Sequence, residues 1–312
     1  MENLMIAVNA VVPFIVYLSF GYAARGLKLA EESFLNKLNT VAFKCFFPIL
    51  MFNNFYTMDL KEGLDPGMIG FMLGFFFLTI VGLFLIVPRV SKENPRRGVI
   101  IQAIFRRNSL LFALPLAQSV FGLTGQTLAS VAVAIMVPLY NVVAVIVLEY
   151  YRGGKVTAGD LIKRILTNPL IIGALIGLVF ILLKIKLPAC VEKPIAAFAN
   201  MTSPLALFIL GGTLHFSAIG KNAKAIIAGA LFNLVILPAL ALLLSMPFSF
   251  SQAERFVIFV VFATPPAVSS FSMAATMGGD AELAGHLIVV ETIASIVTIF
   301  LWILLLKSMA II

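Results

Sequence analysis

The sequence predicts an all-α integral membrane protein with ten transmembrane helices. Three observations lead to this fold class. Hydrophobic residues make up 61% of the 312 residues and charged residues only 12%, whereas a soluble protein keeps about 25% charged residues to cover its surface. Apolar runs of roughly 20 residues, the length that spans a bilayer, recur along the chain. Backbone groups in lipid must be hydrogen-bonded within their own segment, so these runs are predicted to be helices.

The apolar runs are joined by connections too short to hold a soluble domain. The first five runs form one half, residues 1–149, and the last five form a second half, residues 168–312. A short basic, glycine-rich loop at residues 150–167 joins the halves. In chain order the predicted helices are 5–24, 35–55, 67–87, 99–121, 126–149, 168–185, 191–214, 224–246, 254–277 and 285–306.

Lysines and arginines set the expected orientation, because cytoplasmic loops of membrane proteins carry an excess of them. Most loop lysines and arginines follow the first, third, fifth and seventh predicted helices. Those loops are therefore predicted to be cytoplasmic, with both termini outside. The same bias accounts for the net charge of +8 without nucleic acid as a partner. The lipid bilayer is the expected surrounding.

Neither enzymatic nor metal chemistry is indicated. The two cysteines, Cys45 and Cys190, predict neither a disulfide framework nor a metal site. The two histidines, His215 and His286, stand far apart in the sequence near segment ends. The chain carries none of the common nucleophile or zinc motifs. We therefore expect no catalytic residue, no metal and no cofactor.

The two halves are predicted to be inverted repeats. A shift of 156 residues places the first five helices onto the last five in order. Because each half has an odd number of helices, the second must insert upside down, which is the plan of many secondary transporters. The shift superposes Pro13 on Pro169, Gly21 on Gly177, Pro48 on Pro204, Gly122 on Gly278 and Asn108 on Thr264.

Helices four and nine are interrupted at matching places. We expect helix four to break at Pro115, and helix nine at Pro265 and Pro266, which remove two consecutive backbone donors. Each break is predicted to start a half-helix whose N-terminus points at the bilayer midplane. Such N-termini carry partial positive charge and free N–H groups, which favour an anion. The alternative is a pair of prolines that only kink their helices.

Two adjacent arginines, Arg106 and Arg107, lie inside helix four. From a helix start near Val99, a rise of about 1.5 Å per residue places them about 11–12 Å into a core about 30 Å thick. An arginine there costs about 2.5–3.5 kcal/mol on insertion scales, so we expect a role in a binding site. Snorkelling to the cytoplasmic interface is the alternative. Adjacent helical residues point about 100° apart, so at most one of the pair should face the site.

Other polar residues within the spans complete the candidate site. Glu291 is the most isolated intramembrane carboxylate, and it either pairs with an arginine or carries a proton. Freed backbone carbonyls that hold Na⁺ are a second means of coupling. Asn141 is either a site residue or a tie between helices. The predicted substrate-binding residues are Asn108, Arg107, Ser109, Pro115, Thr264, Pro265, Pro266, Ser269, Ser270 and Asn141, and the predicted coupling or ion-pair residues are Glu291 and Arg106.

Over essentially its whole length the chain resembles the auxin efflux carrier family, which includes the plant PIN auxin transporters and many bacterial carriers of the bile acid/auxin transporter superfamily. The resemblance rests on Asn108-Ser-Leu-Leu-Phe-Ala-Leu-Pro115-Leu with Phe121-Gly122, on Pro266-Ala, on Gly278-Gly-Asp-Ala-Glu-Leu-Ala-Gly285, and on Glu291-Thr-Ile-Ala-Ser295. It implies two inverted five-helix repeats with crossed, broken helices four and nine. It also implies a scaffold subdomain (helices 1, 2, 6 and 7), a transport subdomain (helices 3–5 and 8–10), and a homodimer through the scaffold.

Within that resemblance, Asn108 matches the residue that contacts the substrate carboxylate in plant members. Two positions depart from the family pattern: Arg107 stands where a small or neutral residue is usual, and Ser270 replaces a second crossover proline. Both departures point to an anion other than auxin. The short loop 150–167, in place of the long regulatory loop of plant members, suits a protein of the bacterial cytoplasmic membrane.

These observations predict a secondary transporter of a small organic anion, a mono- or dicarboxylate. The anion would bind between helices four and nine and reach each side in turn as the transport subdomain moves past the scaffold. An anion channel or uniporter without ion coupling is the alternative, since broken helices and arginines suit either. Stimulation of uptake by substrate on the opposite side would separate the two.

Overall fold

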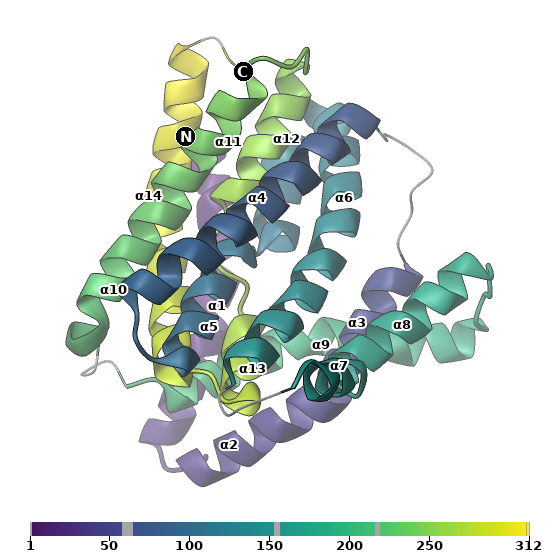
Figure 1. Ribbon diagram of the computed structural model, residues 1–312, viewed down its shortest axis with the longest axis vertical. Coiled ribbons are helices and arrows are strands. Elements are labelled where there is room, and N and C mark those ends of the chain that lie inside the picture. Colours follow the sequence, from purple (N-terminus) through teal and green to yellow (C-terminus); the bar gives the residue numbers. More distant parts are fainter. Residues whose placement is uncertain (1, 58–64, 153–156, 216–218, 310, 312) are drawn as a thin grey trace.

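A computed structural model describes residues 2–57, 65–152, 157–215, 219–309 and 311, and within these ranges it is all-helical (Figure 1). Two short π-helical turns, η1 and η3, interrupt otherwise α-helical segments. The elements are α1 (Glu2–Gly26), α2 (Glu32–Val41), η1 (Ala42–Phe46), α3 (Phe47–Tyr56), α4 (Pro66–Val90), α5 (Asn94–Phe105), α6 (Ser109–Tyr151), α7 (Ala158–Leu166), α8 (Pro169–Leu182), α9 (Ala189–Thr213), α10 (Ile219–Leu231), η3 (Phe232–Ile236), α11 (Leu237–Ser245), α12 (Gln252–Ala263), α13 (Ser269–Met277) and α14 (Ala281–Ser308).

Helix length and composition identify a multi-pass membrane protein. Five helical segments of the described chain are long and apolar enough to cross a bilayer: α4, α6, α9, the run from Ile219 to Ser245, and α14. The pair α7 and α8, bent by 62°, would make a sixth. Each of the ten predicted segments overlaps a helix or a run of helices, but a count of ten spans goes beyond these criteria and stays a prediction.

The structure adds internal detail to three of the predicted segments. The predicted second and eighth helices are each divided by a π-turn followed by a proline, Pro48 in α3 and Pro238 in α11. The loop predicted at 150–167 contains the short helix α7, because Thr157 caps its start by accepting from the Asp160 N–H. The same hydroxyl donates to the Asp160 carboxylate at 2.7 Å, and these bonds lower the pKa of Asp160 below its usual range.

The helix starts follow from local chemistry. Ser251 and Glu254 form a reciprocal capping box at α12, and the Asp280 carboxylate accepts from the Leu283 N–H at the start of α14. The long α6 is two helices joined at Gly122, whose φ of 60° favours glycine. The chain reverses there, since a Cβ built on Gly125 would lie 2.2 Å from the Ala117 carbonyl oxygen. Helices four and five thus meet in the tight connection that the sequence predicted.

Glycines allow close contact between α1 and α9 and between α3 and α8. A Cβ on Gly21 of α1 would lie 1.8 Å from the Phe208 carbonyl oxygen of α9, and one on Gly177 of α8 would lie 2.5 Å from the Phe52 carbonyl oxygen of α3. These two contacts are related by the same 156-residue shift, because Gly21 maps onto Gly177 and Phe52 onto Phe208. Small residues let membrane helices approach this closely.

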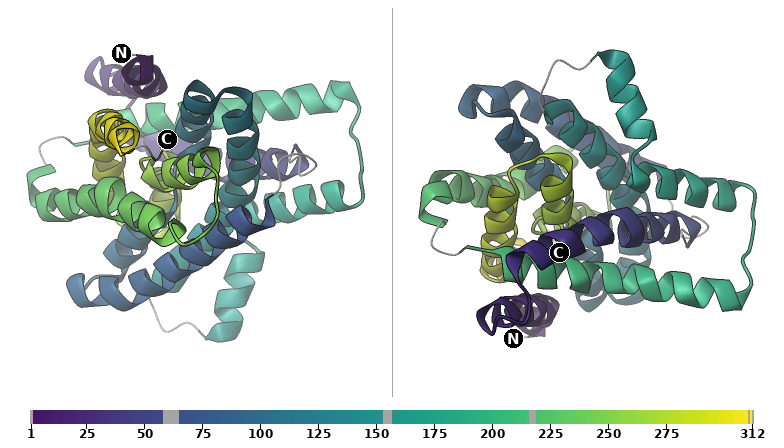
Figure 2. Two further views of the ribbon diagram at one scale, coloured as in Figure 1. Left: turned by 90° about the horizontal axis from the view of Figure 1, so that it is seen from above. Right: turned by 90° about the horizontal axis from the view of Figure 1, so that it is seen from below.

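The views in Figures 1 and 2 divide the helices into two groups. One group, with α4, α6, α10, α11, α12 and α14, forms the upper bundle of Figure 1. The other contains α3, α8 and α9, which extend together to one side of that bundle (Figure 2). The start of α1 and the end of α14 lie toward the same end of the molecule (Figure 1).

Candidate binding site at two crossing helix breaks

Two non-helical segments meet in the interior of the protein. Residues 106–108 separate α5 from α6, and residues 264–268 separate α12 from α13. The backbones pair in one antiparallel bridge between Arg107 and Pro266. On either side of it, the Asn108 N–H donates to the Pro265 carbonyl and the Ala267 N–H donates to the Arg106 carbonyl, each at 2.9 Å. Each break therefore supplies hydrogen-bond partners that the other lacks.

The expectation that Pro115 breaks helix four was wrong. Pro115 lies inside helical backbone, and the helix is already interrupted seven residues earlier, at 106–108. That break contains no proline; Arg106 is extended, Arg107 pairs with the opposite segment, and Asn108 has a φ of −88° and a ψ of 49°, which is neither helical nor extended. The break in helix nine does lie at Pro265 and Pro266, as predicted. The first half of helix four also begins earlier than expected, at Asn94, with Pro95 in its first turn.

The guanidinium of Arg106 is buried and bound to neutral groups. Its Nε donates to the Asn141 amide oxygen at 3.2 Å, and its Nη2 donates to the same oxygen. Its Nη1 donates to the Ser270 hydroxyl at 3.0 Å. Arg106 takes part in none of the ion pairs between described residues, so its predicted pairing with an acid is not observed. Its formal positive charge is held next to the crossing without a counter-charge.

The guanidinium of Arg107 points into a different network. Its Nη1 donates to the Thr264 carbonyl at 3.0 Å, which satisfies an oxygen freed by the break. Its Nη2 donates to the Asn233 amide oxygen at 3.0 Å, and the Asn233 amide nitrogen donates to Glu291 Oε2 at 2.7 Å. The Asn233 side chain thus links a buried arginine to a buried carboxylate without a direct ion pair. We call these three residues the Arg107–Asn233–Glu291 relay.

Neither arginine reaches the membrane interface or an open surface. Only 2% of each arginine is exposed, so neither snorkels to an interface and neither presents its side chain at an open surface. The helical 100° rule does not apply, because the two residues lie in extended backbone. Instead, Arg106 binds groups on α6 and α13, while Arg107 binds groups at the end of α12 and on η3.

The accessible part of the crossing is small and polar. Asn108, Ala267 and Ser269 are partly exposed, and the Asn108 side chain makes no hydrogen bond to another described residue. Asn108 directly precedes α6, and Ser269 is the first residue of α13. The first N–H groups of a helix lack partners within it, although at α13 the Ser270 and Phe271 N–H groups donate to the Ala267 and Val268 carbonyls just before the helix. One free amide side chain and two helix starts therefore come together here.

Most of the remaining predicted site residues are buried behind the partly exposed ones. The Ser109 hydroxyl donates to the Val261 carbonyl at 3.3 Å, and the buried Ser270 and Asn141 both accept from Arg106. Thr264, Pro265 and Pro266 are buried in the backbone crossing, and Pro115 is partly exposed on α6. The structure thus joins nearly all the predicted residues in one place. Most of these residues are buried in contacts within the protein and are not exposed to a ligand.

Sequence reasoning missed Asn233. It is fully buried on the π-turn η3, which adds a residue to the helical turn and often marks a functional position. Its amide also donates to the Ala103 carbonyl at 3.2 Å. The sequence feature that could have identified Asn233 is a lone amide inside an apolar helix. Buried polar residues in membrane spans usually take part in function or in helix–helix contacts.

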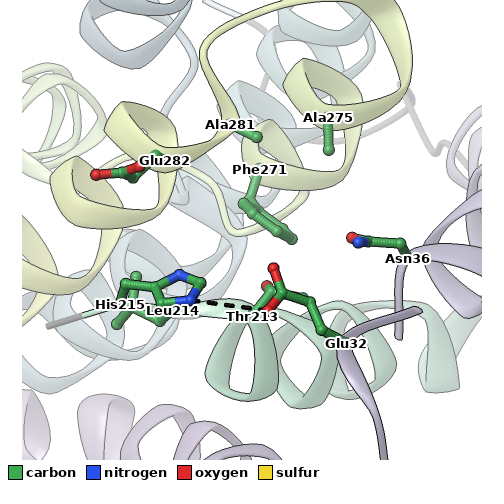
Figure 3. Close-up of a pocket in the computed structure, with 9 residues that line it drawn as sticks. All are labelled: Glu32, Asn36, Thr213, Leu214, His215, Phe271, Ala275, Ala281 and Glu282. Atoms are coloured by element: carbon green, nitrogen blue, oxygen red, sulfur yellow. Dashed lines mark ion pairs between the residues drawn. The ribbon is translucent and has the colours of Figure 1, made fainter. Parts of the chain in front are cut away.

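Two cavities stand out, and no residue of the two breaks lines either of them. One, of about 200 Å³, opens where α2 and the end of α9 face α13; in it His215 and Glu32 approach each other below Phe271 (Figure 3). The other, of about 500 Å³, lies between α4, α5, α10 and α14 and reaches Asn233 and Glu291. No cluster of three or more His, Cys, Asp or Glu side chains that could hold a metal occurs among the described residues.

Comparison with known proteins adds one finding. The sequence profile of a family described as membrane transport protein matches residues 6–303, which is nearly the whole chain. A comparison with curated protein sequences finds no match. The matched region contains both helix breaks and the relay.

Proposed function

The chain belongs to the membrane transport protein family, the family of auxin efflux carriers and PIN-like transporters, and on that premise we propose that it is a secondary transporter of a small organic anion. The substrate class is a mono- or dicarboxylate. The anion binds at the partly exposed face of the crossing, against Asn108 and Ser269. An amide that donates to a carboxylate, next to two helix starts, is a suitable receptor for such a ligand.

One observation carries this proposal: the buried charge of Arg106 has no carboxylate partner. Its Nη1 donates to the Ser270 hydroxyl, one residue from the partly exposed Ser269. Within the relay, the positive charge of Arg107 is offset by the negative charge of Glu291. The charge of Arg106 is not offset, so the crossing keeps a formal charge of about +1. At about 6–8 Å and an effective dielectric of about 20, one such charge attracts an anion by roughly 2–3 kcal/mol. A cationic substrate would be repelled by a similar amount.

Alternating access of this site is the proposed mechanism. The proposal includes ten spans in two inverted five-helix repeats, with helices 1, 2, 6 and 7 as scaffold and helices 3–5 and 8–10 as transport subdomain. The repeat-related contacts of Gly21 with Phe208 and Gly177 with Phe52 support the inverted arrangement. The way α3, α8 and α9 extend together to one side of the upper bundle supports a division into two bodies (Figure 2).

The proposed setting is a bacterial cytoplasmic membrane, with both termini outside and a homodimer formed through the scaffold helices. The orientation is supported by the basic loops that follow α1, α4 and α6. Helix α7 fits the same side, because it combines exposed Ile162 and Leu166 with Lys163 and Arg164, as interfacial helices do.

A ligand screen tests the proposed site. A ligand that binds only the folded protein raises its melting temperature, so the purified protein should be melted with a series of small carboxylates. We expect Asn108→Ala to abolish the shift given by the stabilising carboxylate, with little change in the melting temperature of the free protein. Asn53→Ala, at a partly buried asparagine of α3 distant in sequence from the crossing, is the matched control. An unchanged shift in Asn108→Ala would place the binding site elsewhere.

A second measurement separates a carrier from a channel. Proteoliposomes loaded with the stabilising carboxylate should take up labelled carboxylate faster than empty ones, because a carrier returns its site loaded. A channel gives no such stimulation, so equal rates would overturn alternating access while leaving the binding site intact.

A further inference from the structure

Glu291 is a buried carboxylate with an unused oxygen. It lies on α14 with no exposed surface, and its Oε2 accepts the Asn233 amide hydrogen bond. Its Oε1 has no hydrogen-bond partner among the described residues. An unpaired charged oxygen in low-dielectric surroundings is costly. A bound ligand from outside the protein would therefore stabilise this oxygen.

The 500 Å³ cavity has Glu291 among the residues that line it. Glu291 and Asn233 lie at one end of it, and Ser91, Arg96, Lys221 and Lys224 at the other. The basic end belongs to the loops that the positive-inside bias assigns to the cytoplasm. Between the two ends the walls are apolar, formed by residues such as Val87, Ile100, Ala225 and Leu287. The volume is ample for several waters, each of which takes about 30 Å³ in the liquid.

A proton fits this position better than a metal cation. Glu291 is the only carboxylate among the residues that line the cavity, and the Asn233 amide oxygen is already bound to Arg107. The Thr264 carbonyl freed by the helix break also accepts from Arg107. Too few protein oxygens therefore remain for the coordination shell of Na⁺. A proton needs one oxygen and reaches it along water.

We propose that Glu291 is a proton-binding site of the carrier, filled through this cavity, and that proton binding there and anion binding at the crossing favour each other. The inference rests on the proposed anion site. A proton from the cytoplasmic solvent is relayed along waters in the cavity, each water gaining one proton as it passes one on, and bonds to Oε1, so that the carboxyl becomes neutral. The charge of Arg107, one amide away through Asn233, then loses its counter-charge, so the crossing gains one positive charge. Linkage is reciprocal, so a bound anion raises the proton affinity of Glu291 by the same factor.

The charged and titratable groups around Glu291 are few. From the crossing, Arg107 reaches it through Asn233, and Arg96 of α5 and Lys221 and Lys224 of α10 stand at the far end of the cavity. On α14 itself, His286 is buried and its ring contacts the Asn222 side chain and the His215 carbonyl. Apart from Glu291, the titratable side chains that line the cavity are the cationic Arg96, Lys221 and Lys224, and Arg96 pairs with Asp280 at 3.3 Å. Only Glu291 is therefore placed to take up a proton inside the cavity.

A ligand-free experiment tests the proton site on its own. The single tryptophan, Trp302, donates its indole N–H to the Leu234 carbonyl at 2.8 Å, next to Asn233 in the chain. We expect its fluorescence to titrate with pH in the wild-type protein and to lose that step in Glu291→Gln. The matched control is Glu149→Gln, at a second buried carboxylate, which pairs with Arg152. A step that persists in Glu291→Gln, or that is lost in Glu149→Gln, would overturn the assignment.

The coupling is tested with the carboxylate found in the melting screen. We expect its Kd in the wild-type protein to fall as pH falls, by about 5- to 150-fold, the usual range of coupling between two sites. In Glu291→Gln the Kd should be independent of pH and close to the low-pH wild-type value, and proton uptake on binding should vanish. A pH-dependent Kd in Glu291→Gln overturns the coupling. Absence of any anion binding, with the Trp302 step intact, would instead overturn the proposed substrate and leave the proton site standing.

Discussion

The two helix breaks that meet at the crossing are built in different ways. The segment 264–268 contains Pro265 and Pro266, which cannot donate backbone hydrogen bonds and would interrupt a helix in any surroundings. The segment 106–108 contains no proline, and its residues are ordinary in a helix. It is non-helical because its backbone pairs with the other segment and because two arginines bind groups on neighbouring helices. One break is thus encoded locally, and the other depends on tertiary contacts.

This difference predicts that substitutions in the first break cost more than substitutions in the second. Each buried hydrogen bond to a charged group contributes about 1.5–3 kcal/mol, and the arginines of 106–108 make several. The prolines of 264–268 act mainly by preventing a continuous helix, and the backbone bridge between the two segments also prevents it. The substitutions below run from the largest expected effect to the smallest.

Arg107→Met should have the largest effect. It removes the donors to Thr264 and Asn233 and leaves the Glu291 carboxylate without a nearby cation. Loss of one partner from a buried charge network costs about 3–5 kcal/mol. We expect a marked fall in melting temperature, measured by Trp302 fluorescence in detergent. Arg89→Met, at an exposed arginine of α4, controls for loss of charge alone. Equal melting temperatures for the two variants would mean that the first break does not depend on Arg107.

Ala267→Pro should have an intermediate effect. It removes the N–H that donates to the Arg106 carbonyl at 2.9 Å, which is one of the two backbone–backbone hydrogen bonds between the breaks. A buried carbonyl left without a donor costs about 1–3 kcal/mol. Ala267→Ser keeps the N–H and is the control. Thermal melting of both proteins checks this expectation, and no difference between them would show that the bridge adds little to stability.

Pro265→Ala should have the smallest effect, about 1 kcal/mol or less. Alanine keeps the carbonyl that accepts from the Asn108 N–H, and the bridge still holds the segment open. The variant should melt close to the wild-type temperature and retain the anion-induced shift. A large loss of stability would mean that local proline chemistry, and not the crossing, keeps helix nine broken.

Composition and periodicity alone predicted much of the molecule. The apolar runs gave the helices, because a chain in lipid must satisfy its backbone locally. The residues around Asn108, Arg107, Thr264 and Ser270 were recognised as one site because polar groups are rare and costly in such runs. The break at Pro265 was likewise predicted, since it depends on the backbone chemistry of its own residues.

The tertiary structure decided what local chemistry leaves open. The break at 106–108 exists only because a distant segment offers the partners for its N–H and C=O groups, and no pattern within helix four carries that information. Whether Arg106 and Arg107 face a ligand or hold the crossing depends on which side chains stand opposite them. The role of Asn233, at the π-turn between Arg107 and Glu291, depends on contacts across 126 and 58 residues of sequence. The sequence thus determined which residues form the polar centre of the protein, and packing alone determined which of them support it and which remain free to bind.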